Sequence, residues 1–278
     1  MLKLEDTQNE FKPRCLSIDL EVGKKDNRIH QLAAVRGDNG ESFVQGRQGL
    51  KDALLKLDRF AEDLSFLLGH NLIAFDLPHL QAVKPDLAIL ELPTIDTLRL
   101  NPLAFPRNPY HRLVKHYQDG QLHRGQLNDP ELDARLTLDV FLNQRSAFME
   151  LAQQEPDLML AWHWLATIDD AVSGLNSFFS SIRQASRPTD NEGRRAVESY
   201  LNERCCTNAT RDALKQIEKH AWALAYVIAW LSVSGGNSVM PPWVRHQFPQ
   251  AGLLVRKLRD VPCTEAACEW CRNRHDGQ

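Results

Sequence analysis

The chain has 278 residues, of which 43% are hydrophobic and 25% are charged, and its formal net charge is −3 at pH 7. Its length exceeds the roughly 100–200 residues of one domain, and its composition excludes disordered and fibrous proteins. The net charge does not exclude nucleic-acid binding, because a local basic surface can bind phosphates on an acidic protein. We therefore expect a globular protein of two or three units.

The sequence also limits where the protein works. No apolar run approaches the ~18–20 residues of a membrane span, and the amino terminus MLKLEDTQNE lacks the hydrophobic core of a signal peptide. The six cysteines are too sparse for a disulfide scaffold. We expect a cytoplasmic protein with reduced thiols and no membrane partner.

The first part of the chain has the pattern of a strand meander followed by a helix. Arg14–Val22 is an apolar run punctuated by acids, which predicts a buried strand with carboxylates at its end. Further strands are predicted at Ile29–Val35 and Ser42–Gln45, each after a turn cluster. Apolar residues at three-to-four spacing predict an amphipathic helix over Leu50–Leu68.

The next segments continue the alternation of strands and helices. Residues 69–80 predict a brief strand that turns into a helix started by Pro78. A strand is expected around Thr94–Leu98 and a helix from Pro109 to about Tyr117.

The second half of the chain has helical patterns throughout. Pro130–Phe148 predicts a long amphipathic helix with Asp129 or Asn128 as its amino-terminal cap. Leu151–Ile182 and Gly193–Leu231 show no strand alternation, so we expect a helical domain there.

Two acids at the end of the first predicted strand are candidate metal ligands. Asp19 and Glu21 share one face, because strand side chains alternate with a period of two. Carboxylates inside an apolar strand are costly unless a metal or a hydrogen-bond network compensates them. The alternative is a solvated strand edge, since D-x-E is common by chance.

Two more acids lie at predicted helix starts. Asp76 fits a carboxylate at the mouth of a cleft and fits equally an ordinary helix-capping residue. Asp133 comes just before an apolar stripe, where a lone Asp is usually solvated. The small Ala134 beside it would let the backbone approach the sheet, which favours an inward carboxylate.

Four motifs occur in order: D-L-E from Asp19, G-H-N-x-x-x-F-D-x-x-x-L around Asp76, D-T-L from Asp96 and D-A-R-L-T-x-x-x-F from Asp133. This set resembles the DnaQ-like (DEDD) exonucleases over roughly residues 12–148. The resemblance implies an α/β ribonuclease H-like fold, a mixed five-stranded sheet flanked by helices. It also implies two Mg²⁺ or Mn²⁺ ions on the four carboxylates and removal of nucleotides from 3′ ends.

One departure from the family concerns the general base. The family places a His five residues, or a Tyr four residues, before the last Asp, but Asn128 and Asp129 stand there. A neutral amide cannot accept the proton. His123 is a candidate substitute base, and pairing it with Asp129 instead would leave the D-A-R-L-T motif around Asp133 unexplained. Weakened or absent activity is the alternative.

A cysteine cluster near the carboxyl end predicts a second metal site. Cys263, Cys268, Cys271 and His275 stand at spacings that suit a closed tetrahedral, structural Zn²⁺ site. The alternative is free thiols on a frayed tail. Cys206, next to Cys205, is expected to be an ordinary helix residue.

A cluster of cations and aromatics precedes the cysteines. It predicts a basic surface with stacking platforms for single strands, or alternatively a solvated amphipathic helix. The residues are Arg245, Arg256, Lys257, Arg259, Trp243 and Phe248.

The motif order, together with P-P-W-V-R-H-Q-F-P and the cysteine cluster, is similar to the amino-terminal region of large bacterial RecQ-like helicases. No Walker-type motif occurs, so we expect the chain to be a fragment whose motor lies beyond Gln278 or on another chain. The predicted domains are residues 1–148 (exonuclease), 149–236 (helical) and 237–278 (linker with zinc site).

The expected function is metal-dependent exonuclease action on DNA 3′ ends, in repair or defence. The alternatives are a nuclease-fold module that binds nucleic acid or a partner without efficient chemistry, and an RNA-trimming enzyme.

Overall fold

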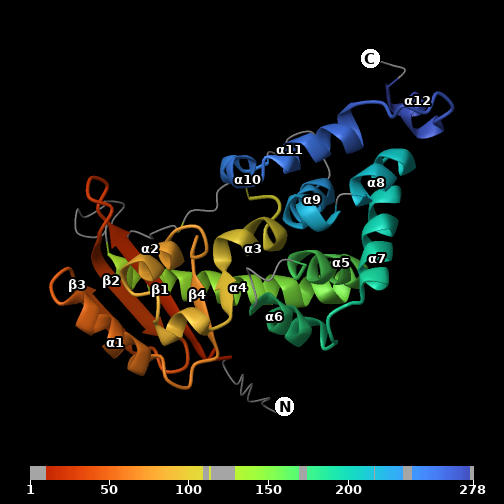
Figure 1. The fold of residues 1–278 in the computed structure, drawn as a ribbon. Coiled ribbons are helices and arrows are strands. Elements are labelled where there is room, and N and C mark those ends of the chain that lie inside the picture. The colour runs from red at the N-terminus through yellow and green to blue at the C-terminus, as the bar shows by residue number, and fades with distance from the viewer. Residues whose placement is uncertain are drawn as a thin grey trace, which may run out of the picture. The chain divides into compact units, whose positions relative to one another are not determined.

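The computed structural model describes residues 11–108, 113, 129–168, 174–215, 217–233 and 240–275 (Figure 1). The chain divides into two compact units. The first comprises Met1–Leu92 and His116–Leu138, and the second comprises Pro93–Lys115 and Asp139–Gln278. Of the helix predicted at 109–117, Leu113 alone lies among the described residues.

A mixed five-stranded sheet forms the centre of the α/β part, as predicted. Its strand order is β3-β2-β1-β4-β5. β1 pairs antiparallel with β2 and parallel with β4, and β2 pairs antiparallel with β3, which confirms the predicted meander. The strands are β1 (Cys15–Val22), β2 (Ile29–Arg36), β3 (Ser42–Gly46), β4 (Phe66–Gly69) and β5 (Thr94–Asp96).

The helix predicted over 50–68 is shorter than expected. α1 (Leu50–Phe60) ends eight residues early, and the apolar run F-L-L-G forms β4. Leu67 and Leu68 are both fully buried, because a parallel strand in mid-sheet is covered on both faces. A continuous apolar run is compatible both with a longer helix and with a buried strand. The spacing of apolar residues alone therefore cannot show where α1 ends and β4 begins.

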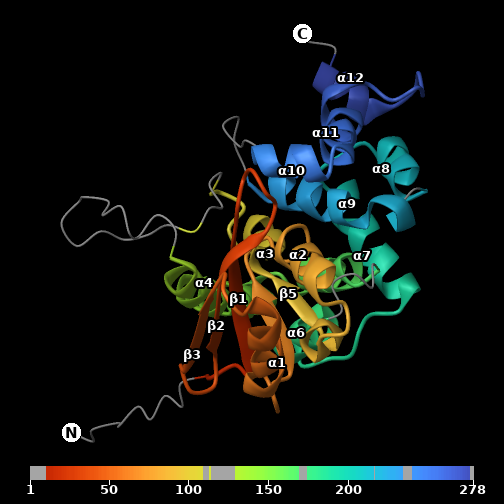
Figure 2. The same cartoon turned by 60° about the vertical axis from the view of Figure 1, so that its left-hand side comes forward.

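The two faces of β1 have different partners (Figures 1 and 2). Leu16, Ile18 and Leu20 point into a hydrophobic core that α1 completes with Leu54 and Leu57. α2 (Asp76–Val83) and the 3-10 turn η1 (Ala88–Glu91) also contribute to this core. The opposite face, with the odd-numbered residues of β1, carries the polar groups described below.

The second unit is helical beyond β5, as predicted. β5 ends at Asp96, whose carboxylate caps α3 by accepting a hydrogen bond from the Leu98 amide at 3.0 Å. The stretch 151–182, predicted to be helical, contains the end of α4 together with α5 and most of α6, and no strand occurs among the described residues after Asp96. The helices are α3 (Thr97–Ala104), α4 (Pro130–Gln154), α5 (Pro156–Ala166), α6 (Gly174–Arg183), α7 (Asp190–Asn202), α8 (Thr207–Leu214), α9 (Ile217–Ser232), α10 (Pro242–Gln247), α11 (Gln250–Val255), the π-turn η4 (Arg256–Asp260) and α12 (Glu269–His275).

Aromatic side chains form the core of this unit. Phe148 packs edge-on against Trp162 and Phe179, with ring centroids 6.4 and 5.4 Å apart. Such T-shaped contacts add to the stabilisation from burial itself. None of the helices in the described part of the chain combines the length and apolarity needed to cross a bilayer.

Candidate metal centres

The carboxylates predicted on β1 share the face opposite the hydrophobic core. Asp19 and Glu21 are half-buried and follow the fully buried Ser17 with the period of two expected of a strand. Asp19 lies opposite Ala33 of β2, and Glu21 lies opposite Gln31. A small residue opposite Asp19 leaves room above this face for the start of α4.

A hydrogen bond between buried groups holds the start of α4 against β1. The Ser17 hydroxyl donates to the Ala134 carbonyl oxygen at 2.7 Å, and both residues are fully buried. Ala134 therefore allows the close approach predicted from its size. The cap predicted for this helix is confirmed as Asp129, whose carboxylate accepts from the Leu132 amide at 3.1 Å.

This contact brings a third acid to the pair on β1. Asp133 precedes Ala134, and one oxygen from each of Asp19, Glu21 and Asp133 lies within 4.8 Å of the others. All three are half-buried. The Asp133 carboxylate therefore points toward Asp19 and Glu21 of β1. This is the inward direction predicted from the small size of Ala134.

Asp76 lies beside the same strand but makes a different contact. It is 2% exposed, and its Oδ1 accepts a hydrogen bond from the Leu20 amide at 3.1 Å. The pairing of β1 with β4 ends at Ser17 and Leu68. Beyond this pair, the Asp76 carboxylate accepts the hydrogen bond of the Leu20 amide. Asp76 thus reaches the backbone between Asp19 and Glu21 without joining their group of three.

Three acids this close can bind a divalent cation. Like charges in a half-buried site make full ionisation costly, and a cation offsets that cost. Carboxylate oxygens are the ligands that Mg²⁺ and Mn²⁺ prefer. The candidate general bases His123 and Asn128 lie outside the described residues, so the structure places neither of them.

The carboxyl-terminal cluster differs from the predicted ligand set. Cys206, Cys263, Cys268 and Cys271 bring their sulfur atoms within 4.8 Å of one another, and His275 is not in this group. The Sγ atoms of Cys206 and Cys268 are 3.4 Å apart. The His275 ring packs instead against Trp270, with centroids 6.2 Å apart.

Cys206 is the residue that sequence reasoning missed. It was expected to be an ordinary helix residue, but it is the N-cap of α8. It is 62 positions from Cys268, so no local spacing could link it to the cluster. In the structure it is 1% exposed.

Polar groups of the protein already face two of the thiols. The Asn208 side-chain amide donates to Cys263 Sγ at 3.6 Å, and the Cys263 amide donates to Cys271 Sγ at 3.3 Å. Burial raises the pKa of Cys271 to about 12. Burial also acts to raise the pKa of Cys263, but its hydrogen bonds with the Glu265 backbone and with Asn208 bring that pKa down to about 7. Hydrogen bonds of this kind can orient the ligands of a metal site.

The spacing of the four thiols fits one tetrahedral ion. Zn–S bonds of ~2.3 Å in a tetrahedron place sulfurs roughly 3.8 Å apart. The cluster can therefore hold a metal such as zinc.

Comparison with protein-family models, curated proteins and solved structures found no match for this chain. The expected membership of the DnaQ-like exonucleases therefore depends on the ordered motifs and on the geometry of the carboxylates.

Proposed function

We propose that the chain is a metal-dependent phosphodiesterase that removes nucleotides from DNA 3′ ends. The observation that carries the proposal is the convergence of Asp19, Glu21 and Asp133, with Asp76 bonded to the strand between the first two. The order of the four sequence motifs around these residues supports the same function. A helicase module in the same or another chain would be its partner.

The protein's part in this chemistry is to hold oxygen ligands in place before substrate arrives. Asp19 and Glu21 are fixed on a central strand, and Ser17 fixes the helix that carries Asp133. When two divalent ions are bound, they make a water molecule more acidic and stabilise the leaving oxygen. Asp76, anchored on the Leu20 amide, would supply the fourth carboxylate.

A nuclease assay with a charge-neutral variant tests the proposal. A single-stranded DNA labelled at its 5′ end should give a ladder of shortened products with Mn²⁺. Asp133→Asn should reduce the rate about a hundredfold or more, because a bound metal contributes several kcal/mol to the transition state. The control is Asp139→Asn, an exposed acid further along the same helix, which should keep the wild-type rate.

A second candidate function follows from the residue five positions before Asp133. Asn128 cannot act as a base there, which favours a module that binds nucleic acid without efficient hydrolysis. Binding without product release, unchanged by Asp133→Asn, would establish this module and exclude the enzyme. Comparing matched RNA and DNA strands decides between a DNA and an RNA exonuclease.

We also propose that the four-cysteine cluster holds a structural Zn²⁺. The purified protein should then contain one equivalent of zinc by mass spectrometry. Cys206→Ser should lose this metal, and His275→Gln should retain it. The reverse result would restore the ligand set predicted from spacing, and an absence of zinc from the wild type would exclude the site.

A further inference from the structure

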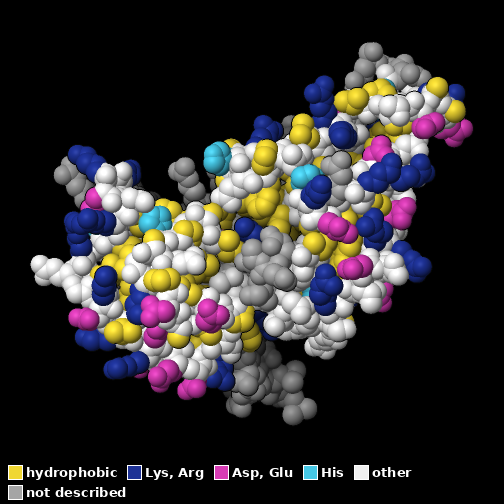
Figure 3. Space-filling model, in the orientation of Figure 1, with side chains coloured by type: hydrophobic (Ala, Val, Ile, Leu, Met, Phe, Trp, Pro, Cys, Tyr) yellow, Lys and Arg dark blue, Asp and Glu magenta, His cyan; other side chains and the backbone are white. Residues whose placement is uncertain are grey.

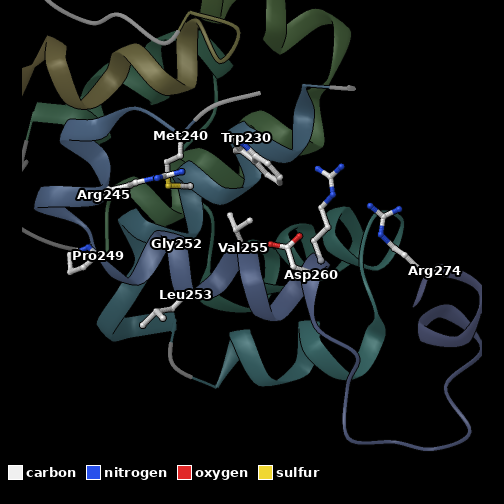
Figure 4. Close-up of a pocket in the computed structure, with 10 residues that line it drawn as sticks. Trp230, Met240, Arg245, Pro249, Gly252, Leu253, Val255, Asp260 and Arg274 are labelled. Atoms are coloured by element: carbon white, nitrogen blue, oxygen red, sulfur yellow. The ribbon is translucent and has the colours of Figure 1, made fainter. Parts of the chain in front are cut away.

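A hollow of about 650 Å³ lies in the helical unit. Residues of α9, α10, α11 and η4 line it, together with Met240 and with Arg274 of α12. We call it the Trp230 groove and define it by Trp230, Met240, Arg245, Leu253, Arg259 and Arg274. Arg245 and Met240 lie at one end, Arg274 at the other, and Trp230 between them (Figure 4).

Cations dominate the charge of the groove. Among the described residues of the lining, Arg245, Arg259 and Arg274 stand against one acid, Asp260, which gives these residues a surplus of two positive charges. Within the part of the chain that the structure describes, none of the three arginines forms an ion pair with a carboxylate. Arg245 and Arg274 are exposed, so both guanidinium groups are available to an anion from solution.

The remaining lining is aromatic and apolar. The Arg259 guanidinium lies over the Trp230 ring, 4.8 Å from its centroid. Leu253 is 53% exposed and Met240 is buried at 5%. Lys and Arg side chains mix with hydrophobic side chains over these carboxyl-terminal helices (Figure 3). Guanidinium groups beside flat apolar surface suit a ligand that carries both phosphates and aromatic bases.

A second hollow lies against some of the same residues, which favours a polymer over a single nucleotide as the ligand. A neighbouring space of about 250 Å³ shares Arg259, Asp260 and Arg274 with the first and adds His275. The Nε2 atom of His275 is buried without a hydrogen-bond partner among the described residues. Two hollows that share arginines can hold successive phosphates of one strand.

We propose that the Trp230 groove binds single-stranded nucleic acid, with bases against Trp230 and Leu253 and phosphates on Arg245 and Arg274. This site belongs to the second unit, whereas the three clustered carboxylates belong to the first. It therefore does not depend on the proposed hydrolysis. The strand should bind without divalent cations added for the carboxylates.

Fluorescence anisotropy of the full chain with a short labelled oligothymidylate, without added divalent cations, tests the groove. The double variant Arg245→Gln, Arg274→Gln should weaken binding about tenfold or more, and the slope of log K against log salt should fall by about 0.7 per lost phosphate contact. Arg272→Gln is the control, since Arg272 is an exposed cation of the same helix as Arg274 that does not line the groove. It should change the affinity less than about twofold.

A second variant blocks the groove without straining the fold. A Cβ at Gly252 would meet no atom within 4 Å, so Gly252→Glu places a negative charge at the groove with room to spare. It should weaken binding as much as the double variant, with an unchanged circular dichroism spectrum.

Equal affinity and equal salt slope in the wild type, the double variant and Gly252→Glu would overturn the proposal. Displacement of the oligonucleotide by polyglutamate at equal charge concentration would also overturn it, in favour of an acidic peptide. Asp133→Asn separates the two proposals: it should slow hydrolysis about a hundredfold or more and leave oligonucleotide binding unchanged.

Discussion

At the scale of single residues, Ser17 decides how closely α4 approaches the sheet. Its hydroxyl donates to the Ala134 carbonyl, and both residues are fully buried. Removing the donor leaves a buried acceptor unsatisfied. We expect the position of Asp133 to loosen as a result.

Ser17→Ala should therefore lower the free energy of unfolding by about 1–3 kcal/mol and weaken Mn²⁺ binding. Urea denaturation and metal titration measure the two effects. Ser146→Ala is the control, because the Ser146 hydroxyl bonds to a carbonyl of its own helix at an exposed position. Equal, small effects from both substitutions would show that Ser17 does not position the helix.

His163 gives a second residue-scale prediction, on pH dependence. Burial lowers its pKa from 6.5 to about 4, and hydrogen bonds from Arg183 and to Asn176 fix the neutral ring. The unfolded chain binds a proton below pH 6.5 that the folded chain does not bind until about pH 4. Stability from this group is thus complete above pH 6.5 and is lost as the pH falls toward 4.

The expected loss between pH 7.5 and 5 is about 2 kcal/mol of unfolding free energy. Urea midpoints at the two pH values measure it. In His163→Gln, this part of the pH dependence should disappear. An identical pH dependence in both proteins would contradict the buried, neutral state of His163.

At the scale of elements, the packing of α7 on α5 depends on a glycine. A Cβ at Gly193 would lie 2.0 Å from the ring of Trp164. That ring is 2% exposed, and its Nε1 donates to Asp190 at 2.9 Å, so it has little freedom to move. The higher helix propensity of Ala favours its substitution for Gly193, whereas the clash with Trp164 disfavours it.

Gly193→Ala should reduce the unfolding free energy by about 1–3 kcal/mol, because overpacking outweighs the gain in helix propensity. The matched control is Gly252→Ala in α11, where a Cβ meets open space. That substitution should stabilise the protein by about 0.5–1 kcal/mol. Chemical denaturation of both variants measures the difference, and the same sign for both would contradict the close contact of α7 with α5.

The elements also show what sequence reasoning could reach. The meander, the start of α4 and its cap at Asp129 followed from alternation, helical spacing and cap chemistry. The position of β4 did not, because its F-L-L-G run continues the spacing of α1; the sequence predicted a brief strand from residue 69 onward, but the strand is Phe66–Gly69. Cys206 did not either, because membership in a thiol cluster is set by tertiary contact and leaves no local pattern.

The carboxylates illustrate both outcomes. Residues two apart lie on the same face of any strand, so the sequence was sufficient to predict that Asp19 and Glu21 share a face. Whether Asp133 pointed inward depended on the approach of two segments, and only the small size of Ala134 hinted at it. Asp76 fitted a ligand and a helix-start role equally, and its bond to the Leu20 amide ties it to the strand.

At the scale of the whole molecule, each unit has its own kind of candidate metal cluster. The first unit gathers carboxylates and the second gathers thiols. Hard oxygen ligands favour Mg²⁺ or Mn²⁺, and sulfur ligands favour Zn²⁺. The two sites should therefore bind different ions. The small net charge of the chain gives no indication of either cluster or of the Trp230 groove.

The central claim is that Asp19, Glu21 and Asp133 together capture a divalent cation. Isothermal titration of the full chain with Mn²⁺ tests it without any substrate. The wild type and Asp139→Asn should bind Mn²⁺ alike, and Asp133→Asn should lose most of this binding. Equal Mn²⁺ binding by the wild type and Asp133→Asn would contradict the claim.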